Sequence, residues 1–195
     1  PESADLVKNL EEPEENVTGV SDYFSIKAQL EEIISIFPDI KTVGVMFSTN
    51  EANSKFQVEE LKKAAIEFDL DVAEVGVNNI NDVSTAIKAL EPKMDIFMAI
   101  TDNTVSSAST IIAESLKTAK IPSFASEEGP VENGILMSAG VDYLDLGKKA
   151  AEMASEVIDG KKVSEVPVLF STDTRKVVNK KTAEALGLDD DNNLM

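Results

Sequence analysis

Hydroxyl, amide and carboxylate side chains gather at three places in the sequence where an apolar stretch has just ended. They are Ser48, Thr49, Asn50 and Asn53; Thr101, Asp102, Asn103 and Thr104; and Glu127 and Glu128. A carboxylate can pair with a cationic group of a small molecule, whereas hydroxyl, amide and helix N-terminal N–H groups can hold an anionic one. If the three places meet in the fold, they have the chemistry to bind a small polar molecule.

A purely structural role is the alternative at each of these places. Asp102 or Asn103 is of the right type to cap the helix that follows, and the polar residues from Ser48 onward suit a loop and a helix cap. Glu127 and Glu128 fit a solvated loop as well as a cleft. An α/β enzyme with Asp102 or Glu127 as its base is disfavoured, because the sequence offers no obvious nucleophile–base pair and no metal-ligand set.

The apolar stretches have the length of buried strands, and helix-period segments separate them. Predicted strands cover Thr42–Phe47, Val72–Val77, Asp95–Ile100, Pro122–Ala125 and Ile135–Ala139. Predicted helices cover Ser25–Phe37, the segment from Ser54 to Phe68, the segment from Asn81 to Leu90, and Thr101–Ala119. This alternation predicts an α/β fold in which a parallel sheet carries helices on both faces. Ligands of such folds bind beyond the carboxyl ends of the strands, where segments 48–54, 101–104 and 126–129 begin.

Shorter patterns predict the structure of the two ends of the sequence. Near the start, Ala4–Leu10 is expected to form a short helix and Asn16–Val20 a strand. Near the end, helices are expected over Tyr143–Ile158 and Lys180–Leu186, and strands over Val166–Phe170 and Lys176–Asn179. Residues Asp189–Met195 are expected to form a frayed acidic tail.

The composition excludes several classes of function. The chain has 195 residues and a formal net charge of −18, with a sequence pI near 4.3, so nucleic acid and anionic membrane surfaces are disfavoured as partners. The local basic cluster Arg175, Lys176, Lys180 and Lys181 fits a solvated face. Because Cys and His are both absent, the usual thiolate nucleophile, His base and zinc ligands are missing, and we expect no metal and no cofactor.

Six motifs, in this order along the chain, resemble one known family. They are NVTGVSD at Asn16–Asp22, TVGVMFSTNEANS at Thr42–Ser54, TDNTV at Thr101–Val105, IPSFASEEG at Ile121–Gly129, GVDYLDLG at Gly140–Gly147 and VVNKKTAEALGL at Val177–Leu188. Each motif is short, but the shared order is far more specific than any one motif. The chain is similar to the ABC transporter substrate-binding family that includes tryptophan- and tyrosine-binding lipoproteins of Gram-positive bacteria.

The resemblance implies a type I periplasmic-binding-protein-like fold with two lobes and a ligand enclosed between them. It implies that residues 24–139 form a complete second lobe and that the first lobe is only partly represented. Residues 1–23 are then a remnant of the first lobe and residues 140–170 a return segment to it. Residues 171–195, a strand, a helix and the acidic tail, have no definite place.

The resemblance also implies an amino acid as ligand, with an aromatic one favoured, held by segments 48–54, 101–104 and 126–129. Asp142 and Tyr143, at the return to the first lobe, are expected to contribute to the same site, with a core position as the alternative for Tyr143. The first hinge is expected at Ser21, Asp22, Tyr23 and Phe24, where an aromatic ring can stack on a flat ligand. Packing at a helix start is the alternative for Phe24.

The implied function is reversible capture of a small solute for an ABC importer, without enzymatic change. The expected partners are the ligand and a membrane permease, and the expected location is extracytoplasmic, as a cell-surface lipoprotein. The alternative is the ligand-sensing domain of a regulator with the same fold. With half of the clamp absent, this chain is expected to bind its ligand weakly or not at all as a monomer, and its exposed sheet edges are expected to favour homodimers or strand swapping.

Overall fold

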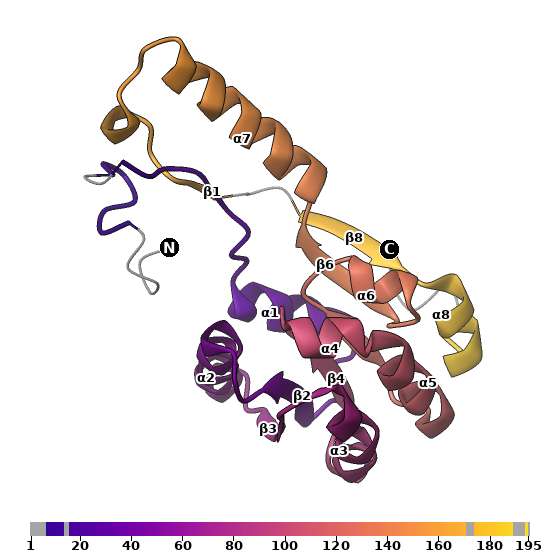
Figure 1. Ribbon diagram of the computed structural model, residues 1–195. Helices are drawn as coiled ribbons and strands as arrows, with labels where there is room; N and C mark the ends of the chain where they lie inside the picture. Colours follow the sequence, from indigo (N-terminus) through magenta and orange to yellow (C-terminus); the bar gives the residue numbers. More distant parts are fainter. Residues whose placement is uncertain (1–6, 14–15, 171–173, 189–193, 195) are drawn as a thin grey trace. The chain divides into compact units, whose positions relative to one another are not determined.

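The structure, a computed structural model, describes residues 7–13, 16–170, 174–188 and 194 (Figure 1). The chain divides into two compact units. Unit 1 is drawn from residues 1–24 and 141–174, and unit 2 from residues 25–140 and 175–195. Each unit therefore consists of two separate segments of the chain.

Unit 2 contains a six-stranded sheet in the order β3-β2-β4-β5-β6-β8. These strands are β2 (Thr42–Ser48), β3 (Asp71–Val77), β4 (Ile96–Ala99), β5 (Ser123–Ala125), β6 (Met137–Val141) and β8 (Thr174–Val178). The first five in that order are joined by parallel pairings, with Val45 opposite Met98 and Ala99 opposite Ala125. The predicted α/β class with a parallel sheet is thus confirmed.

Helices cover both faces of this sheet (Figure 1). One core is shared by α1 (Ile26–Ile36), α2 (Ala52–Glu67) and α8 (Lys180–Leu186). The other is shared by α3 (Val83–Leu90), α4 (Asn103–Ser107), α5 (Ser109–Ala119) and α6 (Gly129–Glu132). Phe97 and Met98 of β4 are both fully buried but belong to opposite cores. Burial on both faces explains why the strand sequence is apolar without alternation.

The pattern of α1 shows how spacing determines which face is buried. Ile26, Leu30 and Ile33, at steps of four and three, are 3%, 0% and 0% exposed, because residues at these steps share one helix face. Removing such a side chain from water contributes roughly 1.5–3 kcal/mol. The helix ends at Ile36, one residue short of the predicted end, because Pro38 has no N–H and cannot continue it.

The long helix predicted over Thr101–Ala119 is interrupted at Ala108, which has φ −98° and ψ 5° and separates α4 from α5. The hydroxyl of Ser109 donates to the carbonyl oxygen of Ser106 at 2.7 Å. Serine hydroxyls compete in this way for the backbone groups of a helix. The sequence reasoning also missed α6, which opens with Gly129 and Pro130; proline is favoured in a first helical turn.

The last segment of the chain completes unit 2. The backbone N–H and the side-chain amide of Asn179 donate to the carbonyl oxygens of Leu136 and Val131, each at 2.8 Å. Thr182 donates its hydroxyl to the carbonyl of Gly134 at 2.8 Å. These bonds hold β8 and α8, so residues 175–188, whose place was open in the sequence, belong to unit 2. Leu194 is buried in the core shared by α1; the rest of the expected acidic tail lies outside the described residues.

Unit 1 contains a two-stranded parallel sheet of β1 (Val20–Ser21) and β7 (Leu169–Phe170), together with α7 (Tyr143–Ile158). The predicted range of α7 is confirmed. Of the strand predicted over Asn16–Val20 only Val20 is confirmed, since β1 begins there and ends at Ser21, and β7 covers only the last two residues of the predicted Val166–Phe170. The helix predicted from Ala4 to Leu10 is absent over its described residues 7–10. There the side-chain oxygen of Asn9 accepts from the N–H groups of Glu11 (3.1 Å) and Glu12 (3.3 Å), which favours a turn over a helix.

Candidate ligand-binding site

The three polar segments lie at one edge of the unit 2 sheet. β2, β4 and β5 are neighbours in the sheet and run parallel, so their carboxyl ends point the same way. Segment 48–54 follows β2, segment 101–104 follows β4 and segment 126–129 follows β5. We call these three segments the carboxyl rim. The predicted convergence is therefore present, at the edge where ligands of open parallel sheets bind.

Asp102 is the buried centre of the carboxyl rim, with 1% of its surface exposed. Its Oδ2 accepts from the backbone N–H of Ser48 at 2.6 Å, and its Oδ1 accepts from the backbone N–H of Val105 at 2.9 Å. The second bond caps α4, so the structural role proposed as an alternative is realised. The first bond ties the end of β2 to the start of α4. A contact with ligand stays a prediction for this residue.

Glu51 and Asn103 form a second bridge between the same two segments. Glu51 Oε2 accepts from the side-chain amide of Asn103 at 2.9 Å and from its backbone N–H at 3.4 Å. The sequence reasoning did not single out Glu51, because an acidic residue just before a helix is ordinarily a solvated one. Its position within segment 48–54 was the signal that could have included it.

Thr101 is held from helix α2. Gln57 Nε2 donates to the carbonyl oxygen of Thr101 at 3.0 Å, and Gln57 Oε1 accepts from the backbone N–H of Thr101 at 3.2 Å. Asn53 Nδ2 also donates to the Thr101 carbonyl at 3.2 Å. Asn53 was a predicted site residue, whereas Gln57 was missed because it lies inside the helix, beyond the loop.

Thr49 and Asn50 turn toward the end of β3. The Thr49 hydroxyl donates to Asn78 Oδ1 at 2.6 Å, and the Asn50 amide donates to the Asn78 carbonyl at 3.3 Å. Ser48 is buried, and its hydroxyl accepts a long bond of 3.4 Å from the Asn50 N–H. These contacts fit the loop role weighed for the segment, and the predicted ligand contacts of its side chains stay predictions. Thr104 is half-buried in the first turn of α4.

The segment after β5 is anchored by side chains from three other elements. Ser106 of α4 donates its hydroxyl to Glu127 Oε1 at 2.9 Å. The hydroxyl of Ser126 donates to Oε1 of Gln29, a buried residue of α1, at 2.7 Å. Glu128 forms an ion pair of 3.4 Å with Arg175 of β8. Both glutamates are half-buried, and their predicted ligand contacts stay predictions.

A close backbone approach lies beneath this segment. A Cβ atom on Gly140 of β6 would lie 2.3 Å from the carbonyl oxygen of Ser126. No other residue type fits that distance without moving backbone, so Gly140 allows β6 to pass directly under the rim.

The remaining predicted residues belong to unit 1. Asp142 caps α7, since its Oδ1 accepts from the N–H groups of Leu144 (2.9 Å) and Asp145 (3.2 Å). The hydroxyl of Tyr143 donates to Asp22 Oδ2 at 3.3 Å. Tyr143 is 42% exposed, so the alternative of a core position is wrong. The bond between Tyr143 and Asp22 joins the start of α7 to the segment after β1.

In the first-hinge segment, the Ser21 hydroxyl accepts from the N–H of Tyr23 at 3.3 Å. Tyr23 is 42% exposed, and the half-buried Phe24 is the last residue of the first segment of unit 1. The predicted hinge and ligand roles of these residues stay predictions.

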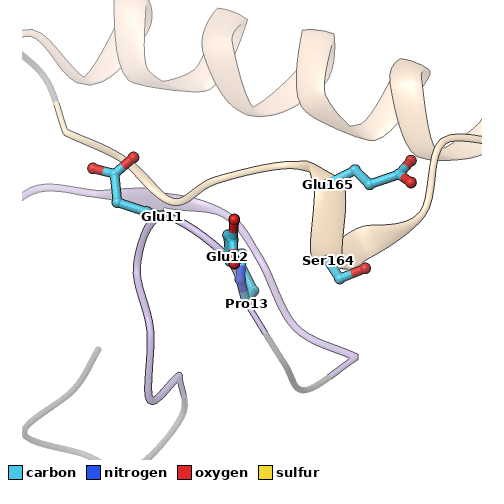
Figure 2. A pocket seen from close by; sticks show the side chains of 5 residues that line it. All are labelled: Glu11, Glu12, Pro13, Ser164 and Glu165. Atoms are coloured by element: carbon cyan, nitrogen blue, oxygen red, sulfur yellow. The ribbon is translucent and has the colours of Figure 1, made fainter.

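Two surface hollows of about 500 Å³ each are lined by residues outside the carboxyl rim. Figure 2 shows one, in unit 1, lined by Glu11, Glu12, Pro13, Ser164 and Glu165. The other, in unit 2, includes Lys41, which precedes β2, and Asp71, the first residue of β3. Three like-charged carboxylates dominate the first, and the second lies at the edge opposite the rim. Neither is a better candidate than the rim. Within the described ranges no group of three acidic residues is arranged to hold a metal ion.

The whole chain, residues 1–195, matches the family described as ABC transporter substrate binding protein. The chain belongs to this family. Its members are substrate-binding proteins rather than enzymes. Among the described residues no helix has the length and apolar character needed to span a bilayer.

Similar proteins include a tyrosine-binding protein of Clostridioides difficile strain R20291, 41% identical over 96% of this chain and 54% of its own length. The ABC domain from Streptococcus pneumonia solved in complex with L-Trp is 36% identical, with a TM-score of 0.86, over 96% of this chain and 63% of that one. A ligand-free, open substrate-binding protein with adhesive properties from Clostridium difficile is 42% identical, with a TM-score of 0.84, over 97% of this chain and 64% of that one. The chain spans about half the length of the curated relatives it matches.

Proposed function

We propose that this chain is part of the solute-binding component of an ABC importer and that it reversibly binds an amino acid, with an aromatic one favoured. The observation that carries the proposal is the meeting of three polar segments at the carboxyl edge of β2, β4 and β5. The relatives described as tyrosine-binding and as bound to L-Trp support the ligand class.

The charges at the rim suit the ammonium group of an amino acid. Glu51, Asp102 and Glu127 each contribute a carboxylate to the carboxyl rim. Asp102 is buried and accepts from two backbone N–H groups, whereas Glu127 is half-buried and accepts from the hydroxyl of Ser106. In the proposal, Glu127 pairs with the ammonium group, while amide and hydroxyl groups such as Asn53 and Thr104 hydrogen-bond the rest of the ligand.

The wider setting is also part of the proposal. The ligand is enclosed in a cleft between two lobes, one of them built on unit 2, and hinge closure about Ser21–Phe24 and Asp142–Tyr143 accompanies binding. The loaded protein delivers its ligand to a membrane permease. It is extracytoplasmic and held at the cell surface as a lipoprotein. Family membership supports this setting.

Calorimetric titration with tyrosine, tryptophan, phenylalanine and small aliphatic amino acids tests the proposal. We expect heat from at least one aromatic amino acid and a weaker response to the aliphatic ones. Because the chain spans about half of its relatives, we expect micromolar affinity, about 8 kcal/mol, to fall toward millimolar. A chain that responds to no amino acid, even at millimolar concentration, would defeat the ligand assignment and leave the fold unchanged.

Two neighbouring glutamates provide a matched pair of variants. Glu127→Gln removes the charge proposed to face the ammonium group, and a hydrogen bond to a charged group is worth about 1.5–3 kcal/mol, so we expect affinity to fall roughly tenfold or more. Glu128→Gln removes an equal charge that pairs with Arg175, and we expect little change. Equal effects of the two variants would contradict the role given to Glu127.

A further inference from the structure

We propose that Gln57 is a positioning residue for the ligand site: its carboxamide fixes the backbone of Thr101 and thereby orients the start of α4. The inference rests on the proposed function, because it concerns the same rim. It adds a residue that lies outside the predicted site and that would not itself touch the ligand.

The geometry of the Gln57–Thr101 pair carries the inference. The carboxamide donates to the carbonyl oxygen of Thr101 at 3.0 Å and accepts from the N–H of the same residue at 3.2 Å. In a sheet, a neighbouring strand likewise supplies an acceptor for the backbone N–H of a residue and a donor for its carbonyl oxygen. Thr101 lies two residues beyond Ala99, the last residue of β4. Gln57 therefore extends the bonding pattern of the sheet past the end of the strand.

Helix α2 does not need this arrangement for its own stability. Within the helix, the Gln57 amide makes only a long bond of 3.4 Å, to the carbonyl oxygen of Asn53. The buried face of α2 is formed by other residues, among them Val58, Leu61 and Ala65. The two shorter bonds of Gln57 both leave the helix and end on one rim residue. Their effect is on Thr101, not on α2.

Fixing Thr101 fixes the groups that follow it. Asp102 caps α4 and holds the Ser48 N–H, and Asn103 is bridged to Glu51. With Gln57 in place, these bonds set the direction of residues 101–104 before any ligand arrives. Preorganisation of this kind raises affinity by lowering the ordering cost of binding. Loss of the Gln57 bonds leaves the rim folded but less well ordered.

Three variants test the inference. Gln57→Leu keeps the approximate size and removes both bonds, and Gln57→Glu keeps the acceptor for the Thr101 N–H but loses the donor. Lys63→Ala, an exposed position on the same helix, is the control. Because Gln57 and Thr101 are half-buried, water can replace the lost bonds, and we expect all three variants to melt close to the parent chain.

Amide hydrogen exchange followed by NMR is the first measurement and needs no ligand. We expect exchange at Thr101 and the next residues to accelerate roughly fivefold in Gln57→Leu and less in Gln57→Glu, since a hydrogen bond contributes about 1 kcal/mol. Amides of β4, Ile96–Ala99, should be unchanged. An unchanged exchange rate at Thr101 would mean that Gln57 does not order this residue. An equal acceleration throughout β4 would mean that Gln57 acts only on overall stability. Either result would overturn the inference.

Titration of the same labelled proteins with L-tryptophan and L-tyrosine is the second measurement. We expect the rim amides of the parent chain and of Lys63→Ala to shift at the same concentration. Gln57→Leu should need a concentration roughly three to thirty times higher, and Gln57→Glu an intermediate one. Equal affinities of Gln57→Leu and the parent would overturn the inference. A parent chain that does not respond would instead count against the proposed function, and the exchange measurement would still decide whether Gln57 orders Thr101.

Discussion

One carboxylate lies at each end of β4 and ties that strand to β2. At the amino end, Asp95 Oδ2 accepts from the N–H groups of Lys41 (2.7 Å) and Thr42 (2.8 Å). At the carboxyl end, Asp102 accepts from the N–H of Ser48 at 2.6 Å and, within its own helix turn, from Val105 at 2.9 Å. Asp95 is exposed, whereas Asp102 is 1% exposed.

The same chemistry therefore has different consequences at the two ends. Water can take over the donors that Asp95 satisfies, but it has no access to the buried donors that Asp102 satisfies. The carboxyl end is also crossed by bonds from Glu51, Asn53 and Gln57. The edge at which ligand binding is proposed is thus the edge whose backbone geometry is the more strictly fixed.

The largest effect is expected from Asp102→Ala. It leaves two buried N–H groups without an acceptor and removes a helix cap, so we expect unit 2 to lose about 2–4 kcal/mol of unfolding free energy. Far-ultraviolet circular dichroism during urea unfolding measures this loss. Both tyrosines of the chain belong to unit 1, so tyrosine fluorescence provides a control that should change little. A loss of unfolding free energy no larger than that of Asp95→Ala would contradict the difference between the two ends of β4.

Gly140→Ala tests the carboxyl edge through packing instead of hydrogen bonding. The added Cβ would meet the backbone oxygen of Ser126 at 2.3 Å, and backbone cannot rotate away as a side chain can. We expect a loss of about 1–3 kcal/mol and shifted NMR signals for Ser126 and Glu127. Unchanged NMR signals in that segment would contradict the rigid backbone assigned to the carboxyl rim.

Gly44→Ala is the corresponding test nearer the amino end. Its Cβ would meet the Sδ of Met94 at 2.0 Å, but a methionine side chain is flexible and can repack. We expect a loss of about 1 kcal/mol, smaller than that of Gly140→Ala under the same urea unfolding. The reverse order would contradict the assignment of the stiffer backbone to the carboxyl edge.

The smallest effect is expected from Asp95→Ala. Its two bonds are exposed to water, so we expect a loss of about 0.5–1 kcal/mol. Titration with L-tryptophan should give the same affinity as the parent chain, because Asp95 lies at the edge opposite the rim. A change in affinity would mean that the two ends of β4 are coupled through the sheet.

The fold could be predicted from the sequence where its signals are local and repeated. The step pattern of α1 reflects the single helix face that meets the core, and the continuous apolar runs of β2 and β4 reflect burial on both faces of the sheet. Both patterns are confirmed. The break at Ala108 was not predicted, because it depends on a Ser109 hydroxyl bond that competes with the helix backbone. The helix prediction was wrong over residues 7–10 for a similar reason. The side-chain oxygen of Asn9 accepts from the N–H groups of Glu11 and Glu12, which favours a turn.

The candidate site could be predicted to the level of segments, not of side-chain contacts. Parallel strands bring their carboxyl ends together, so the polar segments after β2, β4 and β5 could be expected to meet. Which of their side chains turn inward depends on bonds between residues far apart in sequence. Examples are Asp102 to Ser48, Gln57 to Thr101 and Ser126 to Gln29. No local pattern in the sequence encodes these pairs.

Strand β8, the edge strand next to β6, is made late in synthesis on the ribosome. Unit 2 begins at Ser25, but its sheet is complete only when the residues after 174 have emerged. Until then β6 presents an unpaired edge, and Leu136 and Val131 lack the bonds that Asn179 supplies. An unpaired strand edge invites association with other chains. A nascent chain that stalls within unit 1 is therefore at greater risk of aggregation than one released with β8 and α8 in place.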